Sequence, residues 1–569
     1  MILPKLNGKA GSEKLTKRFL GIQQVDIPAE GAFFDAENIS SDRYPVMSVR
    51  RPRQKVRTLS SPGGITAKTE LAWVDGNQLY YDGEAVAEVE PGEKDFVSMG
   101  AWLIVWPDGV RYNTRDKSVD RLGQKNTSSG TVSFTLCEVD GTEYTDYIVS
   151  DTAPEDTGKY WLCTSDKPHV LKKYNSATEL WNSIPTTYVK IEATGIGMGL
   201  SEGDTVTVSG VEGIEAETFN ADFLLADAKD NCIVVTAIID ETFSQTEEVT
   251  VERKIPEIEY LVEYGNRLWG CSSETNEIYA CKLGDPKNWN CYAGLATDSY
   301  AATVGSDGPF TGAAVQGGYV LFFKENCIHT VYGTKPSNFQ IEQLHCEGVQ
   351  PGSKRSLCTV GSTLYYKADH GVMAFDGSTP NKISAALGDV FYKNAAAGTE
   401  CGKLILSMEN AEREPGIFVY DTQTGIWCRE DGLRVTQFTS LNGNAYALDD
   451  EGNIWRMTPE NGEETEGPVK WWAETGILDP YTLDAQYQNR IRFRIWIEEK
   501  SSFMVQVQYD DGEWELVWSM VGKKNGAVLI PVVLRRCDHL KIRIGGTGAC
   551  KIYAMSHVLA VGSEQREEL

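Results

Sequence analysis

Residues 418–427 read Phe-Val-Tyr-Asp-Thr-Gln-Thr-Gly-Ile-Trp, and this stretch decides the fold class. An apolar run ends at Tyr420, Asp421 and Gly425 follow, and a second apolar run begins at Ile426. Aspartate side chains accept hydrogen bonds from the backbone of tight turns, and glycine supplies the backbone angles that such turns need. The aromatic residues on both sides favour strands. The stretch therefore predicts two short antiparallel strands joined by a turn.

The same unit, an apolar strand followed by a glycine or aspartate turn and an aromatic-rich strand, recurs along the chain. Copies begin near residues 71, 102, 259, 317, 359, 403 and 441. A spacing of about 40–50 residues in the second half is typical of propeller blades, which must stack around an axis to bury both faces. The stretch at 418–427 resembles the outer strands of kelch-type blades, although the kelch double glycine and the WD dipeptide are absent. The sequence predicts an all-β chain built on a β-propeller of about seven blades.

Two regions differ from this repeat. Residues 203–210 (Gly-Asp-Thr-Val-Thr-Val-Ser-Gly) alternate Val and Thr between glycines, and residues 490–497 (Arg-Ile-Arg-Phe-Arg-Ile-Trp-Ile) alternate strictly. Both patterns indicate half-buried strands of small sandwiches or barrels. We expect five regions: an extended N-terminal docking arm at 1–57, the first propeller blades at 58–123, an inserted small β-barrel or sandwich at 124–254, the remaining blades at 255–460, and a C-terminal β-sandwich at 468–563.

The arm contains a basic run at residues 49–57, with five positive charges in nine residues. Such a run is compatible with phosphate binding or a nuclear-type signal. In a chain this acidic, docking on an acidic neighbouring subunit is the interpretation we prefer, because one basic strand cannot offset the charge elsewhere.

Composition excludes several classes of function. The formal net charge of −27 argues against a general nucleic-acid binder, although DNA could still pass along an acidic wall as cargo. The 13 cysteines include no C-x-x-C pair, and Cys271, Cys281 and Cys291 are spaced for strands, so we expect free thiols and no metal. No apolar run is long enough to span a membrane, and the N-terminus lacks the apolar segment of a signal peptide; we therefore expect no membrane insertion and no export by that route.

No motif for catalysis or cofactor binding stands out. Residues 195–199 (Gly-Ile-Gly-Met-Gly) lie between expected strands without a following helix, so they are a turn and not a phosphate loop. The six histidines are scattered, with His370 and His345 in expected core or turn positions. Asp307, Glu325 and Asp369 could face a propeller channel as a glycosidase pair, but turn chemistry explains them better. We expect no enzymatic activity, no catalytic residues, no cofactor and no metal site.

Several pieces of the chain, in their order, resemble the tail-nozzle and related connector proteins of short-tailed bacteriophages. The pieces are residues 19–22, 27–28, 36–39 and 50–53 at the start, 284–289, 304–312 and 322–329 in the middle, and 544–553 with 562–563 at the end. The similarity covers most of the chain.

This resemblance implies a structural virion protein, made in the host cytoplasm, that forms a homo-oligomeric ring of six copies in the tail. Other tail and connector proteins would be its partners, and viral double-stranded DNA would pass through the ring during ejection. Two alternatives remain open: a receptor-binding protein at the tail tip, and a propeller glycoside hydrolase that acts on surface polysaccharide.

Overall fold

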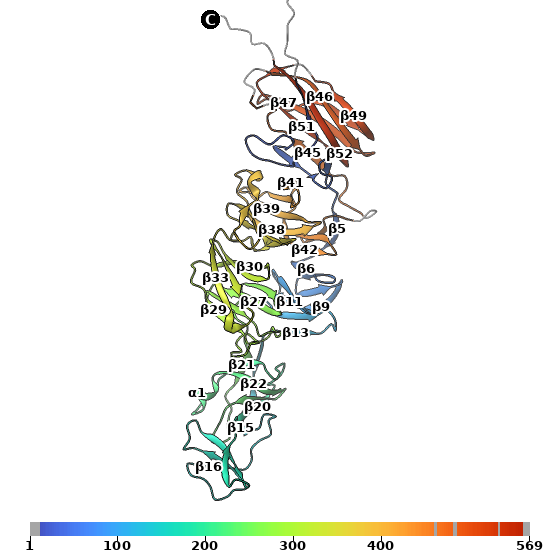
Figure 1. The fold of residues 1–569 in the computed structure, drawn as a ribbon. Helices are drawn as coiled ribbons and strands as arrows, with labels where there is room; N and C mark the ends of the chain where they lie inside the picture. The colour runs from blue at the N-terminus through green and yellow to red at the C-terminus, as the bar shows by residue number, and fades with distance from the viewer. Residues whose placement is uncertain (1–11, 460–463, 479, 482–485, 533–534, 562–569) are drawn as a thin grey trace, which may run out of the picture. The chain divides into compact units, whose positions relative to one another are not determined.

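The computed structural model describes residues 12–459, 464–478, 480–481, 486–532 and 535–561. Regular structure within these ranges is almost entirely β-strand (Figure 1), which confirms the predicted all-β class. The helical turns are α1 (Ala216–Phe219), η1 (Pro336–Asn338), η2 (Lys354–Ser356) and η3 (Ser384–Leu387). Within the described ranges, no helix has the length and apolar character needed to cross a membrane. The chain divides into two compact units, residues 1–95, 308–330 and 343–569 on one hand and residues 96–307 with 331–342 on the other.

Six sheets outside residues 124–253 hold four strands each, in chain order, as far as the chain is described. The first two contain β6 (Pro62–Ala67), β7 (Leu71–Asp75), β8 (Gln78–Tyr81) and β9 (Glu84–Glu88), then β10 (Asp95–Met99), β11 (Trp102–Trp106), β12 (Val110–Asn113) and β13 (Val119–Arg121). The next two contain β26 (Tyr260–Tyr264), β27 (Arg267–Ser272), β28 (Glu277–Ala280) and β29 (Tyr300–Thr303), then β30 (Phe310–Gln316), β31 (Tyr319–Lys324), β32 (Cys327–Tyr332) and β33 (Gln340–His345). The last two contain β34 (Cys358–Val360), β35 (Thr363–Ala368), β36 (Gly371–Phe375) and β37 (Asn381–Lys382), then β38 (Lys393–Glu400), β39 (Lys403–Glu409), β40 (Pro415–Asp421) and β41 (Ile426–Glu430).

A seventh four-stranded sheet takes its last strand from the other end of the chain. It is ordered β42 (Val435–Leu441), β43 (Asn444–Asp449), β44 (Asn453–Arg456) and β5 (Gln54–Thr58). Strand β5 runs antiparallel to β44, with Arg57 opposite Ile454. The sheet is therefore completed only when residues separated by about four hundred positions in the sequence have met.

The turn predicted between residues 420 and 426 is present. The carboxylate of Asp421 accepts hydrogen bonds from the backbone N–H of Gln423 at 3.1 Å and of Thr424 at 3.2 Å. Gly425 has a φ of 71° and donates its N–H to the Asp421 carbonyl at 2.8 Å. A side chain with a Cβ is strained at this backbone angle, which explains the glycine. The quoted stretch thus forms the hairpin β40–β41, as predicted.

Successive sheets of the first unit bury their faces against one another. Ile65 and Trp73 of the first sheet pack with Leu448 and Ile454 of the seventh. The fourth and fifth sheets share a core in which the ring centroids of Phe323 and Tyr366 lie 5.3 Å apart. The sixth and seventh do the same through Ile405, Ile417, Ala445 and Ala447. The first strands of four sheets, β34, β38, β42 and β6, neighbour one another in that order. This is blade-like stacking; the number of blades in a closed propeller stays a prediction.

The second unit holds two of the four-stranded sheets and the strands of residues 124–253. The sheets β10–β13 and β26–β29 share a core that includes Ile104, Trp106, Ile258 and Trp289. The remaining strands form an eight-stranded sheet ordered β14 (Gln124–Thr127), β25 (Thr250–Arg253), β21 (Thr205–Ser209), β22 (Asp222–Lys229), β23 (Cys232–Thr236), β20 (Tyr188–Thr194), β15 (Ser129–Cys137), β24 (Phe243–Gln245). A smaller sheet contains β16 (Tyr147–Ser150), β17 (Tyr160–Cys163), β18 (Val170–Asn175) and β19 (Leu180–Ser183), with β16 parallel to β17. Phe134 stacks on Phe243 at 4.3 Å within the larger sheet's core.

Two further sheets near the C-terminus pack on one apolar core. One is ordered β3 (Ile39–Ser40), β4 (Met47–Val49), β52 (Cys550–Val561), β46 (Gln486–Ile497), β49 (Lys524–Ile530), with β1 (Ser12–Thr16) on β52 and β50 (Arg536–Cys537) on β46. The other is ordered β2 (Asp35–Glu37), β45 (Lys470–Glu474), β51 (Leu540–Thr547), β47 (Ser502–Tyr509), β48 (Glu515–Val521). The alternation predicted for residues 490–497 is present, because Ile491, Phe493, Ile495 and Ile497 are buried while Arg492 and Arg494 are exposed.

The docking of the N-terminal arm, residues 1–57, on another subunit stays a prediction, and the structure shows where residues 12–57 lie within their own chain. Strands β1 to β4 belong to the two C-terminal sheets, and β5 belongs to the seventh four-stranded sheet. Phe19, Ile22 and Phe33 between them are buried in the core of the same chain. The segment lacks periodicity because it donates single short strands to several distant sheets. Residues 1–11 of the expected arm, residue 460 of the expected blades, and residues 479, 482–485, 533–534 and 562–563 of the expected sandwich lie outside the described residues.

Candidate functional site

The strongest polar arrangement in the first unit lies where the N-terminal segment meets β41 and β45. Its centre is Asn38, which is 1% exposed and has a φ of 62°. Asn38 receives the side chain of Arg50 on its Oδ1 at 2.7 Å and the backbone N–H of Asp431 on the same oxygen at 2.9 Å. Its own amide Nδ2 donates to the Lys470 carbonyl at 2.7 Å. One side chain thus holds together the last strand of the sixth sheet, the C-terminal sheets and the N-terminal segment.

Two arginines of the basic run complete this arrangement. Arg50 donates to Glu466 Oε1 at 2.6 Å and to Asp431 Oδ1 at 2.7 Å. Arg53 donates to Glu430 Oε2 at 2.7 Å. The guanidinium side chains of Arg50 and Arg53 are 4% and 2% exposed. The interpretation of the basic run as a docking surface for a neighbouring subunit is therefore wrong for these two residues, which neutralise carboxylates of their own chain.

The other cations of the run are placed differently. Arg57 lies over the ring of Trp73 at 4.6 Å, and Lys55 lies over the ring of Trp455 at 5.4 Å. Through cation–π attraction, Lys55 fastens β5 to β44 of its own sheet, and Arg57 fastens it to β7 of the first sheet. Arg51 is exposed.

We call the network of Asn38, Arg50, Arg53, Glu430, Asp431 and Glu466 the joint. The charges of its arginines and carboxylates favour the ionised forms of both. Burial alone would raise the pKa of Asp431, but Arg53 and Arg50 outweigh it and hold this pKa below its ordinary value. Burial tends to lower the pKa of Arg50, and the carboxylates of Glu430, Asp431 and Glu466 reverse that tendency and raise it. Buried charges of this kind are stable only while every partner is present, so the network fixes one geometry of the segment.

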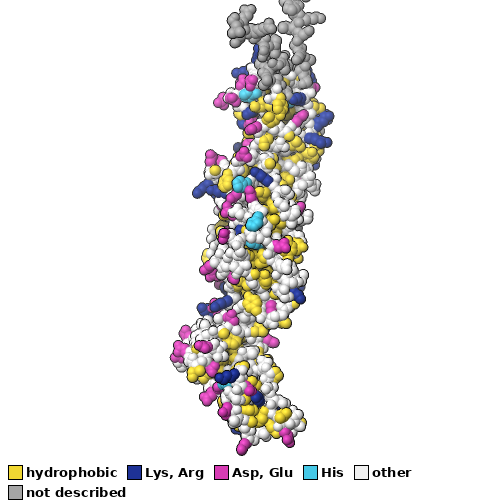
Figure 2. Space-filling view, turned by 60° about the vertical axis from the view of Figure 1, so that its left-hand side comes forward, with side chains coloured by type: hydrophobic (Ala, Val, Ile, Leu, Met, Phe, Trp, Pro, Cys, Tyr) yellow, Lys and Arg dark blue, Asp and Glu magenta, His cyan; other side chains and the backbone are white. Residues whose placement is uncertain are grey.

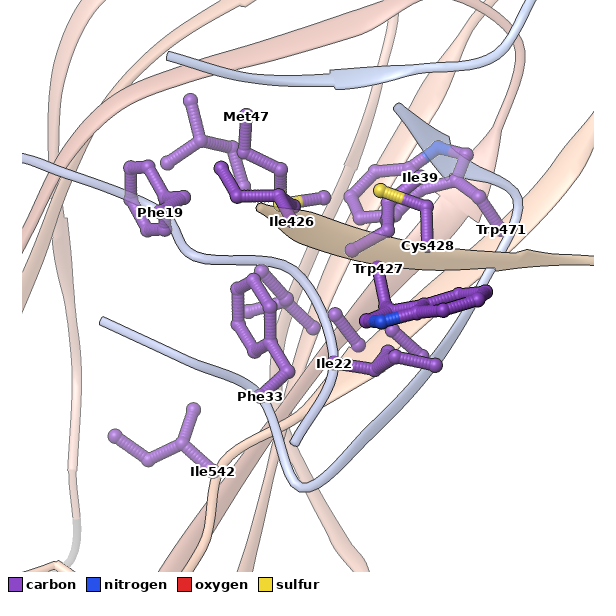
Figure 3. Packing of buried hydrophobic residues seen from close by; sticks show 14 of the residues in the cluster. Phe19, Ile22, Phe33, Ile39, Met47, Ile426, Trp427, Cys428, Trp471 and Ile542 are labelled. Carbon is purple, nitrogen blue, oxygen red and sulfur yellow. The ribbon is translucent and has the colours of Figure 1, made fainter. Parts of the chain in front are cut away.

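An apolar core lies under the network. Figure 3 shows Trp427 of β41 beside Ile22 and Phe33 of the N-terminal segment, and Trp471 of β45 beside Ile39 and Cys428. The indole of Trp427 donates to the Ile383 carbonyl at 3.0 Å. Segments from both ends of the chain therefore share a single core as well as a single charge network.

A polar cleft of about 1260 Å³ opens beside this joint. It is lined by the loop of residues 41–44, the β38–β39 and β40–β41 turns, and residues 496–501 and 548–551 of the C-terminal sheets. The Lys403 ammonium donates to Ser41 Oγ at 2.8 Å and pairs with Asp42. Ser41 Oγ in turn donates to Asp421 Oδ2 at 2.9 Å.

Two carboxyl groups in the cleft have pKa values displaced in opposite directions. Burial raises the pKa of Glu400 above its ordinary value. Burial would also raise the pKa of Asp42, but the Lys403 ammonium outweighs it and lowers this pKa. Two carboxyl groups in one cleft with pKa values displaced in opposite directions are the pairing that glycosidases use. Here, however, both Glu400 oxygens already accept protein hydrogen bonds, from the Ala445 N–H at 3.2 Å and the Thr458 hydroxyl at 2.8 Å.

The carboxylates singled out from the sequence lie elsewhere. Glu325 is exposed in the β31–β32 turn and Asp369 is half-buried in the β35–β36 turn, with no side-chain contact between them among the described residues. Asp307 is exposed in the loop after β29. His370 is exposed and pairs with Glu347 at 2.9 Å. Residues 195–199 form the predicted turn, and no helix follows them before β21.

The cysteines are free thiols, as expected from their spacing. Most are buried, and burial raises the pKa of Cys281 and of Cys428 to about 12, so these thiols are poor nucleophiles. In the part of the chain that the structure describes, no group of three His, Cys, Asp or Glu residues is placed to hold a metal ion.

Sequence reasoning missed the functional role of Asn38, Glu430 and Glu466 in this joint. Nothing local marks Glu430 and Glu466, because their partners Arg53 and Arg50 lie hundreds of residues away, and Asn38 meets Asp431 and Lys470 over similar separations. The positive φ of an asparagine is a weak local signal, since Asn tolerates this region better than most residues.

No protein-family model matches the sequence, and no curated protein matches it either. Among solved structures, BamB from Moraxella catarrhalis is similar to the chain at 10% identity over 73% of this chain and 100% of BamB, with a TM-score of 0.32. PorZ of the Porphyromonas gingivalis type-IX secretion system is similar at 10% identity over 91% of this chain and 80% of PorZ, with a TM-score of 0.26. The endosialidase of phage phi92 is similar at 10% identity over 80% of this chain and 71% of that one, with a TM-score of 0.22. Similarity at this level assigns neither a fold nor an activity.

Proposed function

We propose that this chain is a structural subunit of a bacteriophage tail, of the nozzle type, and that the seven four-stranded sheets outside residues 124–253 are the blades of one β-propeller. Copies of the chain would associate into a ring of six, in contact with other tail and connector proteins. The viral DNA would pass through the ring during ejection. The order of the sequence pieces that resemble tail-nozzle proteins is the reason for choosing this family.

The observation that best supports a structural role is the joint around Asn38 and Arg50. The charged groups of this site form ion pairs with one another. Arg50 and Arg53 are buried against Glu430, Asp431 and Glu466. Strand β5 supplies the outermost strand of the seventh sheet, while β1 to β4 extend the C-terminal sheets. A subunit that carries mechanical load benefits from such closure, because the strands of the N-terminal segment are paired with several sheets of the same chain.

The experiment that tests the proposal is imaging of the purified full-length protein by negative-stain electron microscopy. We expect class averages with a closed ring and sixfold symmetry. Because the proposed DNA is cargo and not a ligand, we also expect no tight, salt-sensitive binding of duplex DNA. A protein that stays monomeric at every concentration, both alone and with a tail extract, contradicts the proposal.

A second candidate function is glycoside hydrolysis in the cleft, and the displaced pKa values of Glu400 and Asp42 are what favour it. Saccharide release from bacterial surface polysaccharide that disappears in Glu400→Gln would support this candidate. Absence of release at any rate near ~1 per second, an ordinary enzyme rate, leaves the structural role as the better account.

A further inference from the structure

We propose that the outward face of β46 and its neighbours is a docking surface for acidic groups of a second copy of this chain. We call it the arginine face and define it by Arg490, Arg492 and Arg494 of β46, Leu529 of β49 and Leu15 of β1. The inference rests on the proposed homo-oligomeric function, and it adds to it the surface through which copies meet.

The strand register places these side chains on one face. Arg492 lies opposite Leu529 of β49 on one side and opposite Ser556 of β52 on the other, and Ser556 lies opposite Leu15 of β1. The alternate residues of β46, such as Phe493, point into the core. Side chains two residues apart on a strand stand roughly 6.8 Å apart, so the three arginines form a straight row about 14 Å long.

The three arginines are exposed, and none of them pairs with a carboxylate or makes a side-chain hydrogen bond within the described part of the chain. Other arginines in or next to the two C-terminal sheets do pair: Arg543 of β51 donates to Glu474 at 2.7 Å, and Arg535, which precedes β50, donates to Glu515 at 2.5 Å. The three arginines are not unpaired for lack of acidic residues, because the chain holds 81 Asp and Glu against 54 Lys and Arg. Three adjacent cations repel one another, and an opposing acidic surface would remove that repulsion.

The residues around the row indicate a protein partner. Leu529 is 61% exposed and Leu15 is 48% exposed, so an exposed apolar side chain lies on each side of Arg492, while Glu13 of β1 lies on the same face in line with Arg490. Figure 2 shows dark blue Lys and Arg side chains beside yellow hydrophobic ones on the surface of the C-terminal sheets. Exposed apolar groups around arginines are the composition of protein interfaces.

A polyanion such as duplex DNA fits this face less well. The outward residues of the neighbouring strand β49 are Asn525, Ala527 and Leu529, so the basic row is only one strand wide. Nucleic-acid surfaces need a broad basic footprint, and the net charge of −27 would repel a phosphate backbone over the rest of the molecule.

The occupant we infer is a second copy, because the chain itself carries the complementary charge. Contact between a basic face on one copy and an acidic surface on the next is a heterologous interface, and such interfaces generate rings when the rotation closes. Strand β49 pairs only with β46 among the described strands, so its other edge is also open to the incoming copy.

The test compares two triple charge reversals. Arg490→Glu, Arg492→Glu and Arg494→Glu together alter the arginine face. Arg115→Glu, Lys254→Glu and Arg413→Glu together are the control, since these side chains are also exposed and the change in charge is the same. Sedimentation velocity and class averages are recorded at about 50 mM and about 500 mM NaCl, which spans strong and weak screening. We expect association of the wild type and of the control to weaken with salt, and the arginine-face variant to associate at least tenfold more weakly.

Each outcome separates this inference from the function on which it rests. If the wild type forms rings and the arginine-face variant forms them equally well, the docking surface is wrong and the ring remains. If the wild type forms no assembly under any condition, both fail. If the wild type binds duplex DNA and the arginine-face variant does not, the face belongs to a polyanion and not to a second copy.

A positive readout comes from Arg492→Lys, which keeps the charge and introduces a primary amine. Labelled and unlabelled copies are mixed and treated with a zero-length carbodiimide. We expect mixed-isotope amide links from residue 492 to a carboxylate of the other copy. Links only within one copy would overturn the inference.

Discussion

The guanidinium of Arg50 lies 2.7 Å from Asp431 Oδ1, and the same guanidinium reaches Asn38, a residue twelve positions before it in the sequence. Asp431 follows β41 directly, so this contact ties the N-terminal segment to the end of the sixth sheet. Both ends of the chain therefore depend on a group whose charge is almost completely removed from water.

Replacement of Arg50 by methionine is expected to destabilise the first unit by about 3–5 kcal/mol, because Glu430, Asp431 and Glu466 then lose their buried counter-charge. Chemical unfolding followed by tryptophan fluorescence measures the change, since Trp427 and Trp471 lie in the adjoining core. Arg51→Met is the matched control, because Arg51 is the exposed neighbour in the same run. Equal midpoints for the two variants would show that the network contributes no stability.

Substitutions of Asn38 separate its backbone role from its side-chain role. Asn38→Gly keeps the φ of 62° accessible but removes the hydrogen bonds to Arg50, Asp431 and Lys470. Asn38→Ala removes the bonds and adds backbone strain, with a total cost of about 2–4 kcal/mol. We expect unfolding midpoints in the order wild type, glycine variant, alanine variant. An alanine variant as stable as the glycine variant would mean that the backbone angle carries no strain.

Strand β5 should be protected from hydrogen exchange in the isolated protein. Its residues, Gln54–Thr58, pair with β44, and two of its cations lie over tryptophan rings, Lys55 over Trp455 of β44 and Arg57 over Trp73 of the first sheet. We expect the amides of β5 that face β44 to exchange at rates similar to those of β44 itself. Exchange of β5 within seconds, with β44 still protected, would restore the idea of an arm that waits for a partner.

The sequence predicts local structure well and long-range pairing poorly, and the reason is physical. Two predicted features depend only on residues close together in the sequence, and both are present. They are the turn at Asp421 and Gly425 and the alternation of Arg492, Phe493 and Arg494. The arrangement around Asn38 is not of this kind, because Arg50, Asp431 and Lys470 meet only after strands from both chain ends have paired. A basic run such as residues 49–57 has the same composition whether it is exposed for a partner or buried against its own carboxylates.

The candidate site shows the same limit. Asp307, Glu325 and Asp369 are candidates for a pair that faces a propeller channel, with turn chemistry as the preferred explanation, and the structure places Glu325 and Asp369 in turns between strands. Neither Glu400 nor Asp42 belongs to a sequence motif, so no local pattern marks them. Burial raises the pKa of Glu400, and the Lys403 ammonium lowers the pKa of Asp42. Both effects arise only in the assembled fold.

Glu400→Gln gives the last prediction, and its sign follows from the direction of the pKa shift. Burial raises the pKa of Glu400 in the folded protein above that of the unfolded chain. The folded state therefore holds the proton more tightly, and the wild type loses stability as pH rises from the unfolded value of 4.5 through the raised folded value. Glutamine cannot ionise and its side-chain oxygen can still accept a hydrogen bond from Ala445 or Thr458, so the variant avoids this loss. We expect Glu400→Gln to be at least as stable as the wild type near pH 8 and the difference to vanish near pH 4, where most glutamates are protonated. Unfolding midpoints across this range measure it, with Glu412→Gln, an exposed glutamate, as the control. A variant that is less stable than the wild type near pH 8 would show that the ionised carboxylate is favourable in the fold, and would strengthen the case for a charged, functional Glu400 in the cleft.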